Sequence, residues 1–238
     1  MEIWIVRHGD PDYVHDTLTE KGEREAKLLA DRLSKIDFSA YYCSPLGRAK
    51  KTASYTLEKS GKTAVTCKWL REFKGKVRDG KSISSCWDRM PSYWCNIDDY
   101  YSYDNWMNVD LMKTVNVNKQ YKKVCKGIDD LMANHGYVHD GNVYKVVKAN
   151  SDKIVLFCHF GVECVMLSHI FHQSPMVLWH NFVALPTSVT RIVSEEREEG
   201  TAIFRCMYFG DISHLYKGDE ELSFQARFCE RYSDNTRH

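Results

Sequence analysis

Short, continuous apolar runs alternate along this chain with segments whose apolar residues recur at helical spacing. The first run, Ile3-Trp4-Ile5-Val6, contains no polar residue, which is typical of a central parallel strand buried on both faces. Further strands are predicted at residues 41–43, 143–147, 154–158, 189–193 and 202–209. This alternation predicts an α/β fold, in which helices cover both faces of a mostly parallel central sheet and form a three-layer α/β/α sandwich.

The helical segments carry their own start signals. One helix is predicted to open at Leu18-Thr19-Glu20, with Thr17 or Thr19 as its N-cap. Another should begin at Ser44-Pro45, where a capping serine precedes a proline at the first helical position. Apolar residues fall at helical spacing in three stretches: Ala26, Leu29, Leu33 and Ile36; Val124, Ile128, Leu131 and Met132; and Val162, Val165, Met166, His169 and Ile170.

One stretch, from about residue 73 to residue 117, follows neither period. Seven aromatic residues crowd into it: Trp87, Tyr93, Trp94, Tyr100, Tyr101, Tyr103 and Trp106. A structureless loop of this length is unusual inside a compact domain. We therefore predict a single domain over residues 1–238 into which a cap, residues 73–117, is inserted with a small aromatic core of its own.

Size and charge exclude several classes of protein. At 238 residues the chain can bury one large core, and its formal net charge of +1 predicts no general attraction to nucleic acid or to membrane surfaces. No run approaches the roughly 18 uninterrupted apolar residues that a membrane helix needs. Arg7 also ends the first apolar run before the core of an export signal could form. These features predict a cytoplasmic protein.

The nine cysteines raise two further possibilities, a disulfide framework and a metal site. Their number is odd, and no two of them form a C-x-x-C pair. Several lie inside apolar strands or helices, where cysteine packs as a small hydrophobe. We therefore predict reduced thiols and no metal ligand set.

Basic side chains follow three of the predicted strands. Arg7-His8-Gly9 comes directly after the first strand, His159 comes directly after residues 154–158, and Arg48 lies in the first turn of a helix after residues 41–43. Ligands bind at the carboxyl edge of an open α/β sheet, and an arginine at a helix N-terminus adds bidentate contacts to phosphate oxygens. If the strands are neighbours, two imidazoles face each other across one phosphate site.

These motifs, in this order, resemble the histidine phosphatase superfamily, the clan of cofactor-dependent phosphoglycerate mutase and its phosphatase relatives. The resemblance rests on residues 7–9 (RHG), 18–22 (LTEKG), 44–53 (SPLGRAKKTA), 70–73 (LREF) and 158–162 (CHFGV). Each motif is weak alone, but their order and spacing are specific, and the resemblance covers about two-thirds of the chain, excluding the aromatic insertion. The resemblance implies a phosphoglycerate mutase-like sandwich.

It also implies covalent catalysis centred on His8. One ring nitrogen of His8 would attack phosphorus, while a backbone carbonyl, which we expect to be that of Gly9, holds the other and fixes the tautomer. Glu72 would protonate the leaving oxygen and then help a water molecule to attack the phosphohistidine. Such catalysis needs no metal and no cofactor.

The same resemblance implies a set of phosphate-binding residues: Arg7, Gly9, Arg48, His159 and Phe160. The arginines and His159, which is also predicted to be catalytic, would offset the charge that builds during in-line transfer. The sequence departs from the family pattern at two places. Residues 10–13 (DPDY) replace a threonine or serine and an asparagine that contact phosphate in many relatives, and Phe160 stands where relatives often have glycine.

Other polar residues are less clearly assigned. His169 falls on an apolar helical face and is predicted to be a core residue, and His172 and His180 receive no role. Asp211 and His214 follow the last strand and could approach the site, although we favour structural packing for both.

The sequence therefore predicts a metal-independent histidine phosphatase that hydrolyses a small phosphorylated metabolite. The segment after Glu72 lacks the phosphoglycerate-binding pattern of true mutases, but a cofactor-primed mutase and an inactive phospholigand-binding protein stay as alternatives. Basic residues outnumber acidic ones between Arg48 and Lys81, which either attracts anionic substrates or forms a solvated helix face. The acidic residues of the insertion disfavour nucleic acid. The substrate itself and the oligomeric state are left open.

Overall fold

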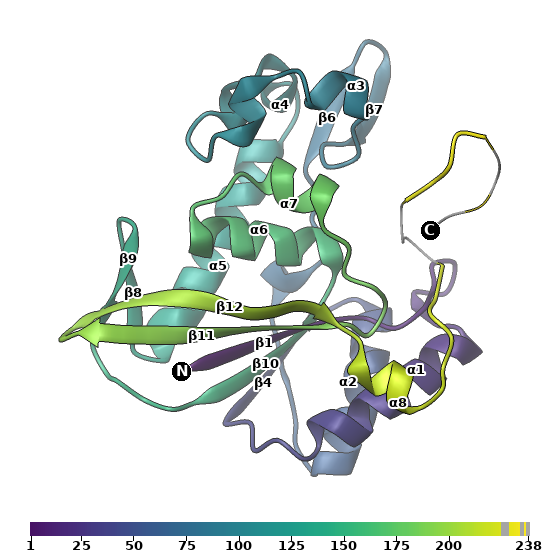
Figure 1. Ribbon diagram of the computed structural model, residues 1–238, viewed down its shortest axis with the longest axis vertical. Coiled ribbons are helices and arrows are strands. Elements are labelled where there is room, and N and C mark those ends of the chain that lie inside the picture. The colour runs from purple at the N-terminus through teal and green to yellow at the C-terminus, as the bar shows by residue number, and fades with distance from the viewer. Residues whose placement is uncertain (225–228, 234–235, 237–238) are drawn as a thin grey trace.

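The computed structural model describes residues 1–224, 229–233 and 236. Within these residues an eight-stranded sheet has the order β5-β4-β10-β1-β11-β12-β9-β8 (Figure 1). Its strands are β1 (Glu2–Arg7), β4 (Ala40–Cys43), β5 (Val65–Thr66), β8 (Tyr137–Asp140), β9 (Val143–Val146), β10 (Lys153–Cys158), β11 (Val189–Glu198) and β12 (Thr201–Asp211). The strands β5, β4, β10 and β1 are parallel, and β11, β12, β9 and β8 extend the sheet by antiparallel pairing. The prediction of a parallel sheet is therefore correct for the half of the sheet that carries the sequence motifs.

Helices cover both faces of this sheet, which confirms the three-layer α/β sandwich. Trp4 and Val6 of β1 face α1 (Glu20–Leu33) and α2 (Gly47–Ser60), where they pack with Leu29. Ile3 and Ile5 point to the opposite face, toward α5 (Val117–Asn134), α6 (Phe160–Phe171) and α7 (Pro175–Asn181). Burying side chains of this size contributes about 1.5–3 kcal/mol each, so the alternation along β1 holds both helical layers in place.

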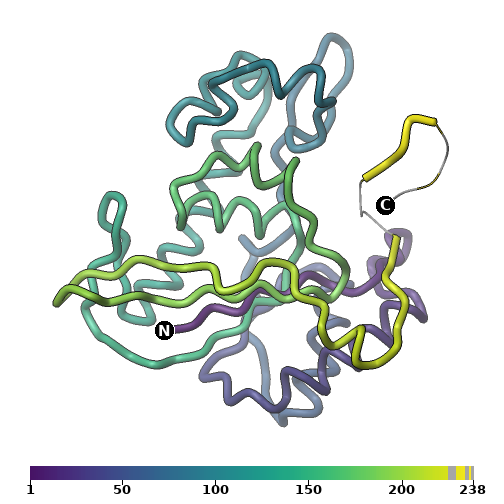
Figure 2. The backbone as a smooth tube through the Cα atoms, viewed as in Figure 1, coloured from purple at the N-terminus to yellow at the C-terminus, as the bar shows by residue number. Residues whose placement is uncertain are grey.

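The two ends of the domain meet in one sheet. Figure 2 shows the hairpin β11–β12 running beside β1, and the register pairs Ile5 with Thr190. The hairpin is longer than predicted, because Arg205 and Glu195 pair across it at 2.7 Å and the strands continue through the charged residues. Only Glu199-Gly200 remain as the turn, with Gly200 at a φ of +76°.

One of the two predicted helix starts is correct. The side chain of Thr19 caps α1 by accepting a hydrogen bond from the Gly22 N–H. The start at Ser44-Pro45 is wrong, because α2 begins at Gly47. The Ser44 hydroxyl lies 2.8 Å from Nε2 of His159, and Oδ2 of Asp16 accepts the Gly47 N–H over 2.7 Å in its place.

The segment over residues 73–117 is folded rather than loose. It contains the hairpin β6 (Lys76–Asp79) and β7 (Ser82–Ser85), the short helices α3 (Pro91–Trp94) and α4 (Asp110–Lys113), and two 3-10 turns between them. The prediction of a separate aromatic core is wrong. Trp106 is buried against Tyr121 of α5 and Trp179 of α7, with ring centroids 5.0 and 5.9 Å away, so the segment shares the main core. Its action as a cap stays a prediction.

Three smaller elements complete the described chain: β2 (Pro11–Asp12), which pairs with β3 (Thr17–Leu18), and α8 (Ser213–Lys217) beside α1. All nine cysteines lie in the described residues, and each is a free thiol. Among the helices of the described part of the chain, none is both long and apolar enough to cross a membrane.

Candidate active site

Sheet register brings the two predicted imidazoles together. Arg7 at the end of β1 pairs with Cys158 at the end of β10, so the residues that follow, His8 and His159, emerge side by side. Their ring centroids are 5.1 Å apart, and the rings are tilted by 59°. Both are almost completely buried, with 2% of His8 and none of His159 exposed.

Hydrogen bonds fix the tautomer of His8. Nδ1 lies 2.8 Å from the carbonyl oxygen of Gly9, the carbonyl expected from the sequence, and Nε2 accepts from Nε of Arg48 over 3.2 Å. Because Nε2 is an acceptor, the proton is on Nδ1, which donates to Gly9. Burial, followed by the charges of Arg7 and Arg48, holds the pKa of His8 well below its ordinary value, so the ring is neutral and Nε2 keeps its lone pair.

The site carries two arginines in different environments. Arg7 is buried, donates from Nη1 to the carbonyl of Ala184, and lies 6.0 Å from the ring centroid of Phe160. Arg48 lies at the start of α2 and donates from Nη1 to Oδ1 of Asp16 over 2.7 Å. The guanidinium groups of Arg7 and Arg48 both lie at the carboxyl edge of the parallel strands, where they could bind one oxyanion together.

Asp16 was missed by sequence reasoning. Its carboxylate both caps α2 through Gly47 and pairs with Arg48, and its backbone has a φ of +49°, a region that Asp tolerates better than most residues. No periodic pattern marks such a residue, which lies in the loop between β2 and β3. Its signal is the three-dimensional contact alone.

His159 and the start of α6 form the second side of the site. Nε2 of His159 lies 2.8 Å from the Ser44 hydroxyl, and within the described residues Nδ1 has no hydrogen-bond partner. Burial, then the neighbouring His8, holds the pKa of His159 well below its ordinary value. His159 is the N-cap residue of α6, so Phe160 lies in the first turn, whose dipole favours an anion.

Glu72 is joined to that same turn. Its Oε1 accepts the backbone N–H of Phe73 over 2.7 Å and that of Val162 over 3.1 Å. A Cβ on Gly161 would lie 2.6 Å from this oxygen, so only glycine allows the carboxyl to approach so closely. Burial raises the pKa of Glu72, although the Phe73 N–H and the charge of Arg7 oppose the rise. A carboxyl with a raised pKa keeps its proton to higher pH than an ordinary glutamate, which suits it to general acid catalysis.

Glu163 is a second residue that the sequence did not reveal. It lies in the first turn of α6, is buried, and has its pKa raised to about 7 by burial, against the effects of Thr190 and Arg7. Its position between Gly161 and Val165 on an otherwise apolar helix gave no reason to single it out. When ionised, this carboxyl interacts favourably with the guanidinium of Arg7.

The remaining candidates have hydrogen-bond, ion-pair or stacking partners of their own. His214 is buried with Nε2 3.1 Å from the Thr187 hydroxyl, and Asp211 pairs with Arg32, which supports structural packing for both. His180 stacks on Trp94 with ring centroids 4.6 Å apart. Each of these contacts is a structural one, and the Thr187 N–H in turn donates to the backbone carbonyl of His8 over 3.1 Å.

His169 is buried, as predicted, but it is not a simple core residue. Its Nε2 lies 2.8 Å from Oδ1 of Asp129, in a separate polar cluster. His172 ends α6 in the left-handed region, with a φ of +51°.

Comparison with known proteins agrees with this geometry. The profile of the histidine phosphatase superfamily (branch 1) matches residues 3–204. The chain is 24% identical to a probable phosphatase of Schizosaccharomyces pombe, over 90% of this chain and 95% of that protein. It is 30% identical to a probable phosphoglycerate mutase, GpmB, of Serratia proteamaculans, over 36% of this chain and 44% of that protein.

A solved structure shares the fold. A mutant phosphoserine phosphatase from Entamoeba histolytica, in complex with phosphoserine, has a TM-score of 0.60 and 18% identity, covering 90% of this chain and 98% of that one. The profile match spans both histidine junctions and most of the sheet. This chain belongs to the histidine phosphatase superfamily, branch 1.

Proposed function

We propose that this chain is a metal-independent phosphomonoesterase that hydrolyses a small phosphorylated metabolite through a phosphohistidine on His8. The observation that carries the proposal is the state of His8, whose Nδ1–H is held by Gly9 while Nε2, unprotonated, faces Arg48 and the ring of His159. A neutral imidazole with one nitrogen anchored and the other directed at cations is arranged for attack on a phosphoryl group.

In the first step Nε2 of His8 bonds to phosphorus and the bond from phosphorus to the leaving oxygen breaks. Glu72 gives its proton to that oxygen, and the raised pKa of Glu72 keeps the proton available. In the second step Glu72, now a carboxylate, takes a proton from water, whose oxygen bonds to phosphorus as the phosphorus–nitrogen bond breaks. Inorganic phosphate leaves, and both groups return to their initial protonation states.

Arg7, Arg48 and His159 would bind the phosphoryl oxygens in this scheme, together with the backbone at Gly9 and Phe160. The substrate phosphate must replace two contacts of Arg48, the one to Nε2 of His8 and the one to Asp16. Once Arg48 has exchanged these contacts, the donors together would stabilise the charge that develops on the phosphoryl oxygens.

Charge around Glu72 supports a substrate with a second anionic group. A cleft of about 230 Å³ lies beside Glu72, and four of the residues that line it are basic: Lys68, Arg71, Lys74 and Lys123. Glu72 is the one carboxylate in this lining. The phosphoserine bound by the Entamoeba histolytica enzyme is a small phosphomonoester with a carboxylate, which is the kind of molecule that such a cleft would accept.

The decisive experiment measures phosphate release from an aryl phosphate and from a panel of phosphorylated metabolites in the presence of EDTA. Wild-type protein should turn over and form an acid-labile phosphoenzyme, whereas His8→Ala should do neither. Turnover that requires a divalent ion and survives His8→Ala would refute the proposal. Phosphate binding without turnover would instead identify an inactive binding protein.

A mutase is the second candidate, because of the similarity to GpmB. A mutase primed by a bisphosphorylated compound would interconvert phosphoglycerate isomers faster than it releases phosphate. Following both products in the same assay separates the two activities.

A further inference from the structure

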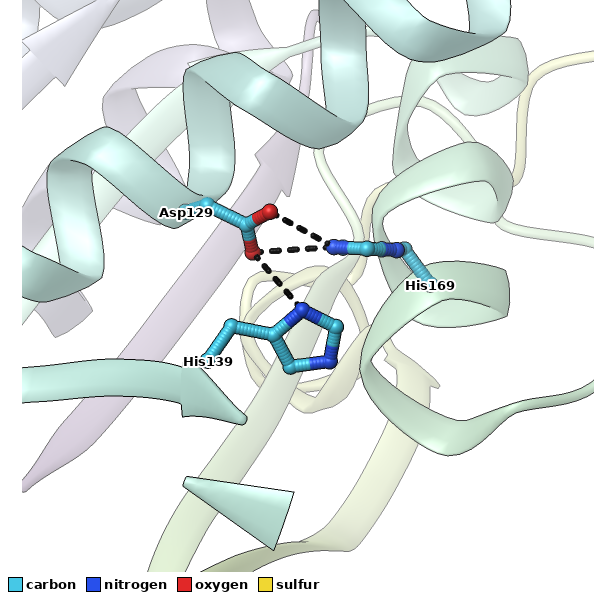
Figure 3. Close-up of side chains that lie close together, drawn as sticks. All are labelled: Asp129, His139 and His169. Atoms are coloured by element: carbon cyan, nitrogen blue, oxygen red, sulfur yellow. Dashed lines mark hydrogen bonds and ion pairs between the residues drawn. The ribbon is translucent and has the colours of Figure 1, made fainter. Parts of the chain in front are cut away.

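Three metal-ligating side chains from separate elements meet outside the active site: Asp129 of α5, His139 of β8 and His169 of α6 (Figure 3). Nε2 of His169 lies 2.8 and 3.0 Å from the two carboxylate oxygens of Asp129, and Nδ1 of His139 lies 3.6 Å from Oδ1. Figure 3 shows nitrogen atoms of both rings directed at the one carboxylate. The three ligand atoms lie within 4.8 Å of one another.

We propose that Asp129, His139 and His169 bind a divalent transition-metal ion of the Zn²⁺ type. A tetrahedral zinc site with bonds of about 2.0–2.1 Å has neighbouring ligand atoms roughly 3.3 Å apart, a spacing that the contacts of Asp129 bracket. Two imidazoles and a carboxylate suit zinc, whereas calcium and magnesium take mainly oxygen ligands.

A simple histidine–aspartate ion pair does not account for the second imidazole. His169 already contacts both oxygens of Asp129, yet Nδ1 of His139 lies 3.6 Å from Oδ1, beyond hydrogen-bond distance, and within the described residues Nε2 of His139 has no hydrogen-bond partner. Ring centroids of the two histidines are only 4.5 Å apart.

An outer contact can support ligation by His169. The hydroxyl of Tyr103 lies 3.3 Å from Nδ1 of His169, and a tyrosine hydroxyl can either donate or accept. Without metal, the Nε2–H donates to Asp129 and Nδ1 accepts from Tyr103. With metal on Nε2, the ring proton would be on Nδ1 and would be donated to Tyr103, as outer partners of metal-bound histidines commonly accept it.

The site is open on one side. The side chains of Asp129, His139 and His169 are 30%, 18% and 9% exposed, so an ion can enter and a water molecule can complete the coordination. His169 lies ten residues after His159, which is about 15 Å along the axis of α6. A bound ion would therefore join β8 to α5 and α6 and stabilise the fold, without taking part in phosphoryl transfer.

This inference does not depend on the proposed function, and direct metal binding tests it. The full chain, stripped by a chelator, is titrated with Zn²⁺ and with Co²⁺, with stoichiometry measured by elemental analysis and coordination by visible absorption. One equivalent should bind, giving tetrahedral Co²⁺ bands without thiolate charge transfer. Outer-shell changes cost 10–100-fold in affinity, so His139→Gln should weaken binding by at least about 100-fold.

Two variants control for other histidine sites. His15→Gln removes an exposed imidazole that pairs with Asp12 at 2.7 Å but belongs to no three-ligand cluster of the described residues, and His8→Gln disrupts the active-site imidazole pair. Both should bind zinc as the wild type does. If His139→Gln proves unfolded by circular dichroism, Asp129→Asn replaces it. Failure of the wild type to bind at micromolar zinc, unchanged binding in a folded His139→Gln or Asp129→Asn protein, or loss of binding in His8→Gln would overturn the proposal.

Discussion

Nε of Arg48 donates a hydrogen bond to Nε2 of His8 over 3.2 Å, so this guanidinium faces the nitrogen that we propose as the nucleophile. The same guanidinium holds Asp16 through Nη1. A substrate phosphate that enters between Arg48 and His8 would exchange both contacts for its own oxygens. In the resting site Arg48 is therefore held by His8 and Asp16, and in the proposed mechanism it would both orient His8 and bind the phosphate.

Replacing Arg48 by lysine should expose this double role. Lysine keeps the charge but cannot donate to His8 and to a phosphate in a fixed fork. We expect Arg48→Lys to lower kcat/KM about 10²–10³-fold, the usual cost of losing one preorganised donor. Phosphate release checks this, with Arg24→Lys as the control. Arg24 is an exposed side chain of α1, and its replacement should change activity less than twofold. Equal activity in the two variants would show that Arg48 has no special function.

Gly161 should be essential for placing Glu72. Alanine there puts a Cβ 2.6 Å from Oε1, so either the carboxyl or the first turn of α6 must move. We expect Gly161→Ala to reduce kcat by at least about tenfold and to destabilise the fold by about 1–3 kcal/mol through overpacking. Removing the carboxyl should relieve the clash. Adding Gly161→Ala to Glu72→Ala should therefore cost much less stability in denaturant melts, and additive losses would contradict the contact.

The pH profile should report His8 and Glu72. Because the pKa of His8 is well below its ordinary value of 6.5, the nucleophile stays neutral into mildly acidic solution, and the acid limb of kcat/KM should fall below pH 6.5. Glu72 must be protonated in the first step, and its raised pKa should extend activity above its ordinary value of 4.5. In Glu72→Gln the basic limb should vanish while the acid limb remains. A basic limb unchanged in that variant would assign it to another group.

Trp106 should unite the segment 73–117 with the rest of the protein. Its ring is fully buried against side chains of α5 and α7, so Trp106→Ala should cost about 3–5 kcal/mol. Wild-type protein should unfold in one transition by near-ultraviolet circular dichroism and by far-ultraviolet signal. Tyr101→Ala, at a half-exposed neighbour, should cost less than about 1 kcal/mol. Two separate unfolding transitions of the wild-type protein would instead indicate that segment 73–117 has an independent core.

The sequence predicted a feature correctly where a single strand or helix determines that feature. The apolar run before Arg7 and the one before His159 gave their strands, and parallel pairing alone then placed the two imidazoles together. The start of α2 was misjudged because Asp16, which is distant in sequence, caps the Gly47 N–H, whereas the Ser44 hydroxyl contacts His159 and accepts the Leu46 N–H ahead of the helix. Local propensity is a weak prior wherever a side chain has a buried partner.

Contacts made across the chain could not be foreseen. Asp16 reaches Arg48 from a loop 32 residues earlier, and Asp129 meets His139 and His169 only because α5, β8 and α6 pack together. No sequence motif and no hydrophobic periodicity links these residues. The same holds for the aromatic segment 73–117, because Trp106 packs against Tyr121 of α5 and Trp179 of α7, which both lie outside the segment.

The stability of the protein should depend on pH through Glu163. Its folded pKa of about 7 exceeds its ordinary value of 4.5, so the folded protein binds a proton that the unfolded chain releases between these values. The stability from this group is complete below pH 4.5 and lost as pH rises through about 7, a loss of about 3 kcal/mol at roughly 1.4 kcal/mol per pH unit.

Glu163→Gln keeps the shape of the side chain but cannot ionise. Urea melts from pH 4.5 to 8 should show that its stability declines less than that of the wild type. Glu58→Gln, at an exposed glutamate of α2, should follow the wild-type curve, and parallel curves for wild type and Glu163→Gln would show that Glu163 ionises normally in the folded protein.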